Sequence, residues 1–389
     1  MSLPDPVKPS TAAAQALGFL DGATGAFVPP IQPATTYERG ADNRLLSGRL
    51  YSRPDNPGYE QAEALLTRLE GGAATAVFSS GMSAATAVFL ALRPGDHVLV
   101  PSVIYWALRG WLAGWATDWG LRIEPVDMTE PARAAAAVRA GETKLVWIET
   151  PANPTLVVTD IAALAEIAHR AGALLAVDST FATPVHTQPI ALGADLVMHS
   201  ATKYLNGHSD VVAGSVTTAA VDDNWQRIKA VRSQVGSVLG PFEAWLLVRG
   251  MRTLFVRVAA QSRAAQQIAE HFSGHTGLEA VLYPGLPGFP GHGVAARQMS
   301  GGFGGMLSLR VKGGAPAALA LLGRLRVWKR ATSLGGVESL IEHRASVEGP
   351  QSATPADLLR LSVGIEDAGD LIDDLGQALR PAGAAGGSG

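Results

Sequence analysis

The chain has 389 residues, of which 47% are hydrophobic and 17% are charged, and its formal net charge is −3. This length exceeds what one simple core supports, so we expect two or more packed units. The small negative charge gives no electrostatic reason to bind nucleic acid or an acidic membrane, and no apolar stretch approaches the roughly 20 residues that span a bilayer. The absence of cysteine excludes disulfides, thiolate nucleophiles and cysteine-based metal sites.

Residues 1–22 contain acids and prolines, whereas a secretory signal needs a basic end followed by an unbroken apolar run. Together with the lack of cysteine, this composition predicts a cytoplasmic protein. We expect neither a metal site nor a nucleic-acid or membrane partner.

Residues 1–55 lack a sustained hydrophobic period and are predicted to form an extended N-terminal arm. Helix and strand patterns alternate after it. In chain order, the predicted helices are 59–72, 81–92, 106–115, 130–141 and 160–173. The predicted strands between and after them are 75–80, 97–103, 121–128, 144–150, 174–180 and 194–200. Short apolar strands alternating with helices indicate an α/β fold, with a mostly parallel central sheet covered on both faces.

The pattern changes near residue 221, where long helices are predicted up to about residue 275. The segments 304–325 and 358–367, closed by a helix over 368–379, then suggest a smaller α+β unit. We therefore predict four parts: an arm (1–55), a ligand-binding domain (56–240), a C-terminal α+β domain (241–380) and a mobile, low-complexity tail (381–389).

Polar clusters follow several of the predicted strands. They read "SSGM" at 79–82, "ETPANP" at 149–154, "DSTFATP" at 178–184 and "HSATK" at 199–203. Ligands of mostly parallel sheets bind beyond the carboxyl ends of the strands, so these clusters mark the expected site.

Lys203 lies in the last of these clusters, between apolar runs that predict buried strands. A lysine partly removed from water is a nucleophile toward aldehydes and forms a Schiff base, although most lysines are solvated or ion-paired. Ser200 and Thr202 beside it carry hydroxyl groups that suit a phosphate. Gly81 and Met82 open a predicted helix, whose first N–H groups favour an anion, while an ordinary serine cap is the simpler reading of "SSGM".

Three further strand-end residues suit a planar cofactor. Asp178 could hold a pyridinium N–H, or be a satisfied loop cap. Asn153 could donate to a ring oxygen, or shape an Asn-Pro turn. Tyr105 could stack on a ring, or be part of the core. Each signal is weak alone, but taken together in chain order they are typical of an enzyme that uses pyridoxal phosphate.

The stretch "VDSTFATP", followed by "QPIALGADLVMHSATKYLNGHSDVVAG", resembles the signature of the Cys/Met-metabolism pyridoxal-phosphate enzymes. The similarity continues through "YSRPDNP", "ETPANPT", "SLGGVESLIEH" and "LLRLSVGIEDAGDLI", and covers Ile31 to Leu379. It implies a fold type I, aspartate-aminotransferase-like transferase in which residues 56–240 bind pyridoxal 5'-phosphate. It also implies a homotetramer built from two dimers.

The resemblance assigns roles to individual residues. Lys203 would bind the cofactor covalently and act as the catalytic base, with Asp178 at the ring nitrogen and Tyr105 on the ring face. The phosphate would be held by Gly81, Met82, Ser200 and Thr202, and completed by Tyr51 and Arg53 of a neighbouring subunit. The amino-acid substrate would meet Asn153 and Arg360 at its carboxylate, and Ser333 would help to position Lys203.

Several positions depart from the family pattern. Leu50 and Thr332 stand where cystathionine γ-enzymes carry acids, and Ala107 stands where methionine γ-lyase has a cysteine. Trp106 replaces a small residue, and Arg344 stands where proline is usual. We interpret these changes as a reshaped distal substrate pocket, lined in part by Leu50 and Thr332, on an intact catalytic core.

The resemblance favours γ-elimination or γ-replacement on an amino acid with a sulfur or oxygen substituent, of the cystathionine γ-synthase or γ-lyase type. The alternatives are an unusual γ-lyase of methionine, O-acylhomoserine or canavanine, or a cystathionine β-lyase. An aminotransferase would share the fold and the lysine, but "YSR" and "SLGGVES" resemble the sulfur-amino-acid branch. "SATK" also fits the S-x-x-K motif of penicillin-recognising hydrolases, but the later S-x-N and K-T-G elements are missing. A non-catalytic scaffold is disfavoured by the complete set of cofactor residues.

Overall fold

The computed structural model describes residues 7–349 and 354–380. The chain forms two compact units, the first made of Met1–Thr150 with Thr159–Phe255, and the second of Pro151–Val158 with Val256–Gly389. We predicted a domain boundary between residues 240 and 241, whereas the structure divides between Phe255 and Val256, near the start of helix α10 (Leu254–Phe272). The predicted tail, 381–389, lies outside the described residues.

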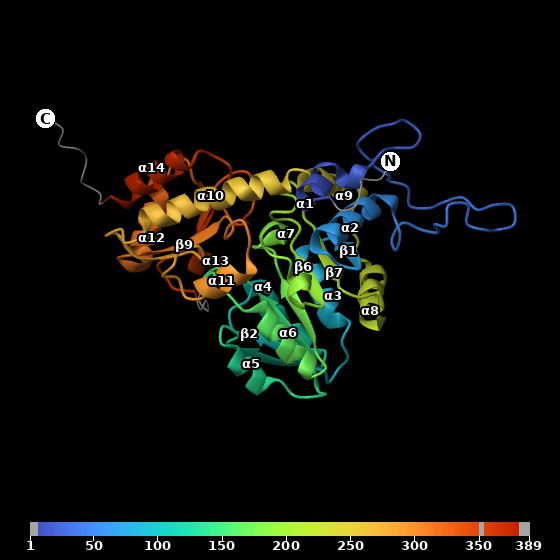
Figure 1. The fold of residues 1–389 in the computed structure, drawn as a ribbon, viewed down its shortest axis with the longest axis horizontal. Helices are drawn as coiled ribbons and strands as arrows, with labels where there is room; N and C mark the ends of the chain where they lie inside the picture. Colours follow the sequence, from blue (N-terminus) through green and yellow to red (C-terminus); the bar gives the residue numbers. More distant parts are fainter. Residues whose placement is uncertain (1–6, 350–353, 381–389) are drawn as a thin grey trace. The chain divides into compact units, whose positions relative to one another are not determined.

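A sheet of seven strands forms the centre of the first unit (Figure 1). In spatial order they are β1 (Ala74–Phe78), β7 (Gly214–Thr218), β6 (Leu196–His199), β5 (Leu174–Asp178), β4 (Thr143–Glu149), β2 (His97–Pro101) and β3 (Arg122–Val126). Neighbouring strands are parallel except at β7, which is antiparallel to β1 and to β6. The predicted mostly parallel sheet is confirmed, and the carboxyl ends of the six like-directed strands share one edge.

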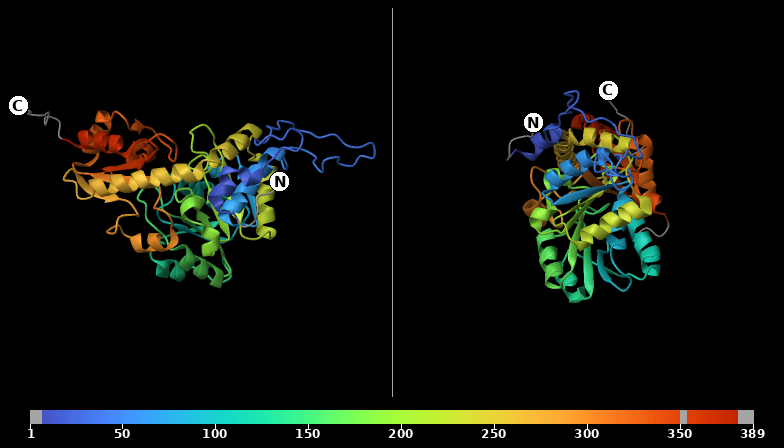
Figure 2. Two further views of the ribbon diagram at one scale, coloured as in Figure 1. Left: turned by 45° about the horizontal axis from the view of Figure 1, so that its top comes forward. Right: turned by 90° about the vertical axis from the view of Figure 1, so that its right-hand side faces the viewer.

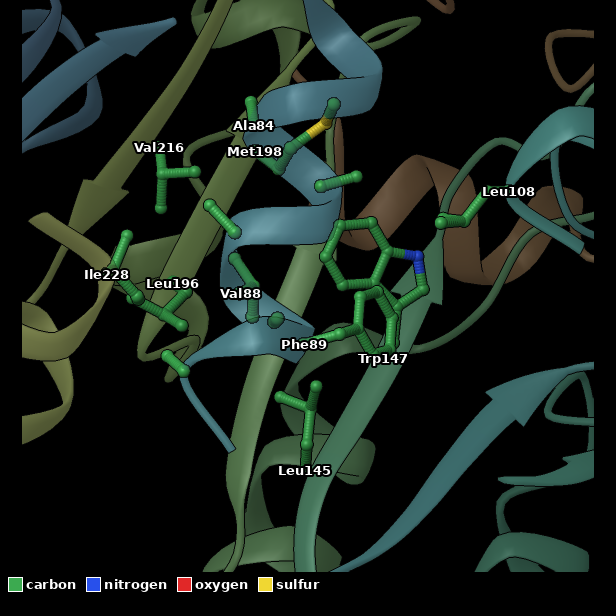
Figure 3. Packing of buried hydrophobic residues seen from close by; sticks show 14 of the residues in the cluster. Ala84, Val88, Phe89, Leu108, Leu145, Trp147, Leu196, Met198, Val216 and Ile228 are labelled. Carbon is green, nitrogen blue, oxygen red and sulfur yellow. The ribbon is translucent and has the colours of Figure 1, made fainter. Parts of the chain in front are cut away.

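The two faces of this sheet carry separate cores, because successive side chains of a strand point to opposite sides. Trp147 of β4 packs with Phe89 in one core, their ring centroids 5.0 Å apart (Figure 3), whereas Val146 and Ile148 belong to the other. The first core is contacted by α3 (Gly81–Leu90), α4 (Trp106–Trp111) and α8 (Asp223–Val231), and the second by α5 (Pro131–Ala137) and α6 (Ile161–Arg170).

Local caps explain where these helices begin. The side chain of Asn56 accepts a hydrogen bond from Gly58 at the start of α2 (Pro57–Glu70), and Asp160, predicted as a cap, accepts from Ala163 at the start of α6. The remaining helical elements of the first unit are α1 (Pro9–Ala14), η1 (Ala16–Gly18), α7 (Thr183–His186), η3 (Pro189–Leu192), η4 (Arg232–Gly236) and α9 (Pro241–Met251).

The segment predicted as the helix 106–115 is helical, but it changes its hydrogen-bond pattern midway. Helix α4 ends at Trp111 and continues as a π-helical segment, η2 (Leu112–Ala116). Trp111, Trp115 and Trp119 stack along this segment with centroid separations of 5.4 and 5.6 Å, and the last two are exposed. A widened turn with tryptophans four residues apart cannot be read from a hydrophobic period alone.

Residues 20–51 form an extended excursion of the arm, drawn in blue in Figure 2. The excursion folds back on itself through isolated β-bridges that join Thr36 to Tyr51 and Arg39 to Leu45. Exposed apolar side chains gather on it, among them Phe27 at 75% and Leu46 at 68%.

The second unit is built on a five-stranded sheet. In spatial order its strands are β10 (Lys329–Arg330), β11 (Leu340–His343), β12 (Leu358–Ser362), β9 (Met306–Val311) and β8 (Leu278–Leu282). All pairs are antiparallel except β10 with β11. The helices are α10, seen as one long rod in Figure 2, with α11 (His292–Gln298), α12 (Gly314–Arg324), α13 (Arg344–Glu348) and α14 (Ala368–Leu379).

This second unit is the predicted smaller α+β unit. Within the described ranges, no helix combines the length and the apolar character needed to cross a bilayer.

Candidate active site

Lys203 lies in the loop that connects β6 to the antiparallel strand β7. The loop turns at once after His199, where the N–H of Lys203 donates to the carbonyl of Ser200 over 3.0 Å. Thr202 fastens the loop to the start of β7: its N–H and its hydroxyl donate to the carbonyl of Ala213, and its Oγ1 accepts from the N–H of Ala213. Lys203 is therefore held half-buried at a strand end instead of in open solvent.

The start of helix α3 approaches this loop at Gly81. A β-carbon on Gly81 would lie 2.6 Å from Oγ of Ser200, so no side chain fits there without displacing the loop. Ser80 and Ser83 cap the helix reciprocally, each side chain accepting from the other's N–H over 3.0 Å. No described residue accepts from the N–H groups of Gly81 and Met82, which leaves two donors at the positive end of the helix for an anion.

Asp178 is the last residue of β5, and alternation along the strand places its side chain on the face of α3 and α4. Its Oδ1 accepts from the N–H (3.0 Å) and the hydroxyl (2.6 Å) of Thr180, while no described residue donates to Oδ2. Burial raises the pKa of Asp178, and the Thr180 hydrogen bonds and the charge of His199 act in the opposite direction. A half-buried carboxylate with one oxygen that accepts no hydrogen bond from a described residue suits a cationic N–H such as a pyridinium.

Two buried side chains near this strand end were missed by the sequence analysis. Nε2 of His199, the last residue of β6, lies 2.6 Å from Oε1 of Glu70, the last residue of α2, and both are at most 1% exposed. Thr180 also connects two strand ends, because its hydroxyl accepts from the N–H of Ser200. A histidine inside an apolar strand and an acid closing an amphipathic helix were the available signals for the first pair.

Tyr105 is fixed through its backbone at the entrance to α4. Its N–H donates to Oε2 of Glu149, the last residue of β4, over 2.9 Å. The ring is 37% exposed and meets the ring of Trp106, itself 40% exposed, edge-on at 6.1 Å. An aromatic ring held beside the strand ends with an open face can stack on a planar ligand.

In the second unit, Arg360 of β12 stands directly opposite Glu342 of β11. Its guanidinium is buried: Nη1 donates to Oδ1 of Asn153 (3.2 Å), and Nη2 donates to the carbonyl of Ser333 (2.7 Å) and lies 2.6 Å from Oε1 of Glu342. The structure thus brings together Asn153, Ser333 and Arg360, all predicted, with Glu342, which was not. Because Oδ1 of Asn153 accepts from Arg360, the donor groups of this side chain are on its amide nitrogen.

The predicted arm residues and Thr332 are exposed. Leu50 and Tyr51 in the arm are 54% and 45% exposed, and the guanidinium of Arg53 lies 5.7 Å from the centroid of the Tyr51 ring. Within the described part of the first unit, no hydrogen bond or ring contact joins them to Lys203. Thr332, in the second unit, is also exposed.

The residues present in the first unit fit pyridoxal phosphate. A glycine-lined helix start offers two amide donors for the phosphate, and Asp178 offers an open carboxylate oxygen for a ring N–H. Lys203 is half-buried in the loop that approaches Gly81 through Ser200. No rearrangement of the chain is needed for this assignment.

Comparison with known proteins agrees with this fit. Residues 10–380 match the family described as Cys/Met metabolism PLP-dependent enzyme. A cystathionine gamma-synthase of Mycobacterium leprae (strain TN) is 44% identical over 365 residues, which cover 92% of this chain and 93% of that protein. A cystathionine gamma-lyase of Bacillus subtilis (strain 168) is 42% identical over 369 residues, with 92% and 96% covered.

A solved structure shows the same fold. The crystal structure of cystathionine gamma synthase from Xanthomonas oryzae pv. oryzae in complex with cystathionine superposes with a TM-score of 0.91 at 40% identity, covering 96% of this chain and 98% of that one. The predicted fold class, the cofactor pyridoxal phosphate and the class of reaction, γ-elimination or γ-replacement on a substituted amino acid, are confirmed. With a match over nearly its whole length, this chain belongs to the Cys/Met metabolism family of pyridoxal-phosphate-dependent enzymes.

Proposed function

We propose that Lys203, Asp178, Tyr105 and the start of α3 bind pyridoxal phosphate in the first unit. Lys203 carries the cofactor aldehyde, and Asp178 receives the ring N–H on its open oxygen. Gly81, Met82, Ser200 and Thr202 surround the phosphate, with Thr202 acting mainly by holding the loop to Ala213. The observation that carries this proposal is the close approach of Gly81 to Ser200, which places two unpaired amides beside the lysine loop.

The chemistry divides between cofactor and protein. Bound pyridoxal phosphate supplies an electron sink for the electron pair left at Cα when its proton is removed. The amine of Lys203 would remove that proton and carry protons to neighbouring carbons. Asp178 would pair with the ring N–H. Arg360 holds the substrate carboxylate through its guanidinium, and the amide of Asn153 donates beside it.

The substrate that we propose first is of the cystathionine type, as in a γ-synthase or γ-lyase. The names of the two curated relatives support this choice. Leu50 and Thr332 point to the alternative, since neither side chain can pair with a distal ammonium group. Trp106, which is exposed and lies beside Tyr105 in the first unit, adds apolar surface next to Tyr105. Methionine, an O-acylhomoserine or canavanine, or β-elimination of cystathionine, is therefore the second candidate.

We also propose a homotetramer in which Tyr51 and Arg53 complete the phosphate site of a neighbouring subunit. The exposed apolar side chains of the arm support a protein partner for it, since a patch of this kind is seldom left in water. A cytoplasmic location stays a prediction.

A substrate panel tests the proposed function. The enzyme would be given cystathionine, methionine, homocysteine, O-acetylhomoserine, O-succinylhomoserine and canavanine, and assayed for 2-oxobutyrate, pyruvate and amino-acid products. We expect 2-oxobutyrate, or a γ-replacement product when a thiol is added, from at least one of them. Pyruvate alone would indicate β-chemistry, and no turnover of any member would contradict the proposal. Mixing Lys203→Ala with Arg53→Ala protein should restore part of the activity if the arm acts between subunits.

A further inference from the structure

Four buried side chains of the second unit form an unbroken series of ion pairs, which we call the charge chain. Nη2 of Arg360 lies 2.6 Å from Oε1 of Glu342, and Nη1 of Arg344 lies 2.9 Å from the same oxygen. Nε of Arg344 lies 3.0 Å from Oε1 of Glu348. Each of the four side chains is at most 6% exposed, and their charges alternate in sign along the chain.

The fold determines these positions. Glu342 and Arg360 are paired across β11 and β12, and Arg344 and Glu348 are the first and last residues of α13, four residues apart on one helix face. The hydroxyl of Thr354 donates to Oε2 of Glu348 over 3.0 Å, which holds the far end of the chain. Arg344 is thus placed between two acids, one on each side.

The balance of charge shows what Arg344 does. The charge chain carries two positive and two negative groups, so its sum is zero. Without Arg344, Glu342 would lose one of the two guanidinium groups that its Oε1 contacts, and Glu348 would lose the pairing with Nε of Arg344. Glu342 would then be neutralised by Arg360 alone, and buried charges interact strongly because little water screens them.

We propose that Arg344 is a positioning residue that keeps the guanidinium of Arg360 able to bind the carboxylate of the amino-acid substrate. Arg344 shares Oε1 of Glu342 with Arg360 and also pairs with Glu348. The substrate carboxylate therefore approaches a cluster whose four charges sum to zero. This inference rests on the proposed role of Arg360. It also gives a physical role to an arginine that stands where the family resemblance leads us to expect proline.

Four variants test the proposal in the full-length holoenzyme. Arg344→Met removes the charge and keeps an apolar stem, while Arg344→Met combined with Glu348→Gln restores a neutral cluster. Arg360→Met is the reference for loss of the carboxylate site. Arg310→Met is the matched control, because Arg310 pairs with Asp357 over 2.6 Å in the same unit but lies outside the charge chain.

The probes are two competitive inhibitors that differ only in the carboxylate, L-norleucine and n-pentylamine. For Arg344→Met we expect the inhibition constant of norleucine, and the KM of the best substrate from the panel, to rise by on the order of tenfold. The inhibition constant of pentylamine and kcat should change less than about threefold. The double variant should recover most of the norleucine affinity, and Arg310→Met should match the wild type.

The outcomes separate this inference from the proposed function. If Arg360→Met weakens norleucine selectively but Arg344→Met does not, or if the double variant fails to recover, the proposed role of Arg344 is wrong. If Arg360→Met itself shows no preference for norleucine over pentylamine, the assignment of Arg360 fails instead. If Arg344→Met does not fold, Arg344→Lys, which keeps the charge but cannot reach both acids in fork geometry, should show a smaller rise confined to norleucine. Equal weakening of both inhibitors by Arg344→Lys would overturn the proposal.

Discussion

The cofactor region of the first unit and the charge chain of the second unit are organised by different forces. Around Lys203, the structure is held by backbone groups and small polar side chains. These are the strand ends, the start of α3, the contact of Gly81 with Ser200 and the hydrogen bonds of Thr180 and Thr202. Around Arg360, four ionised side chains balance one another away from water. The first region should therefore be sensitive to added volume, and the second to changes of charge.

This difference bears on how each region could change in evolution or by design. A region built from backbone donors keeps its geometry when its neighbours are exchanged, since few side chains take part. A balanced set of ions must change in pairs, because removing one member leaves an uncompensated buried charge. Arg344 and Glu348 are such a pair, and both occupy the short helix α13.

The largest effect should follow Lys203→Ala. Loss of the catalytic base alone is expected to lower kcat by about 10²–10⁴-fold, and loss of the covalent link should remove the visible absorption of the protein that borohydride reduces. Absorption spectra and turnover of the best substrate check both effects. Unchanged spectra in Lys203→Ala would show that the cofactor is held elsewhere.

Asp178→Asn is expected to lower kcat by about 10²-fold, because the ring nitrogen loses its charged partner. The same substitution should increase the stability of the apoprotein at neutral pH. Burial raises the pKa of Asp178, so the folded apoprotein binds more protons there than the unfolded chain, and its stability falls as the pH rises from about 3.9, the unfolded value, through the raised pKa.

At pH values above the raised pKa of Asp178, Asp178→Asn should therefore increase the free energy of unfolding of the apoprotein. At pH values below about 3.9, the two apoproteins should have the same free energy of unfolding. Urea denaturation of both apoproteins at a series of pH values measures this. A stability difference that is constant with pH would mean that Asp178 is not the titrating group.

Gly81→Ala tests the steric side of the comparison. Its β-carbon would come within 3 Å of Ser200, and overpacking of this kind costs about 1–3 kcal/mol. We expect cofactor affinity to fall by about tenfold or more, measured by titrating apoprotein with pyridoxal phosphate. An affinity equal to that of the wild type would show that α3 and the lysine loop can separate without consequence.

The smallest effect should come from the matched change Gly376→Ala in α14. Apart from the backbone of its own helix, no described atom lies within 4 Å of the added carbon. Alanine stabilises a helix interior by about 0.5–1 kcal/mol relative to glycine. Thermal unfolding should show a small gain and kinetics no change. A loss of stability would mean that α14 packs against a surface that the isolated chain does not show.

The sequence predicted the parallel sheet and the polar strand ends well, because short apolar strands separated by helices leave few other architectures. Asp178 and Ser200 could be placed at the sheet edge because each ends or directly follows such a strand, and Lys203 because it lies in the loop that follows, while their roles stay predictions. The role of Arg344 could not be found in this way. It depends on the pairing of β11 with β12, which places Glu342 opposite Arg360, and no local pattern reveals that register.

Other gaps have similar causes. The contact of His199 with Glu70 joins residues 129 positions apart, and the backbone bond from Tyr105 to Glu149 spans 44. Such contacts depend on the packing of α2 and α4 on the sheet, which hydrophobic periodicity does not specify. The arm residues Leu50, Tyr51 and Arg53 were assigned by resemblance alone, and their roles stay predictions.

The place of β1 in the sheet has a consequence for folding order. Among the described residues of the seven-stranded sheet, β1 is synthesised first, yet it pairs only with β7, the strand synthesised last, which begins at Gly214. Until β7 emerges from the ribosome, the backbone N–H and C=O groups of β1 have no strand to pair with. The pairing of β1 with β7 is therefore a long-range contact, which slows folding, and an unpaired strand edge can associate with other chains in the meantime.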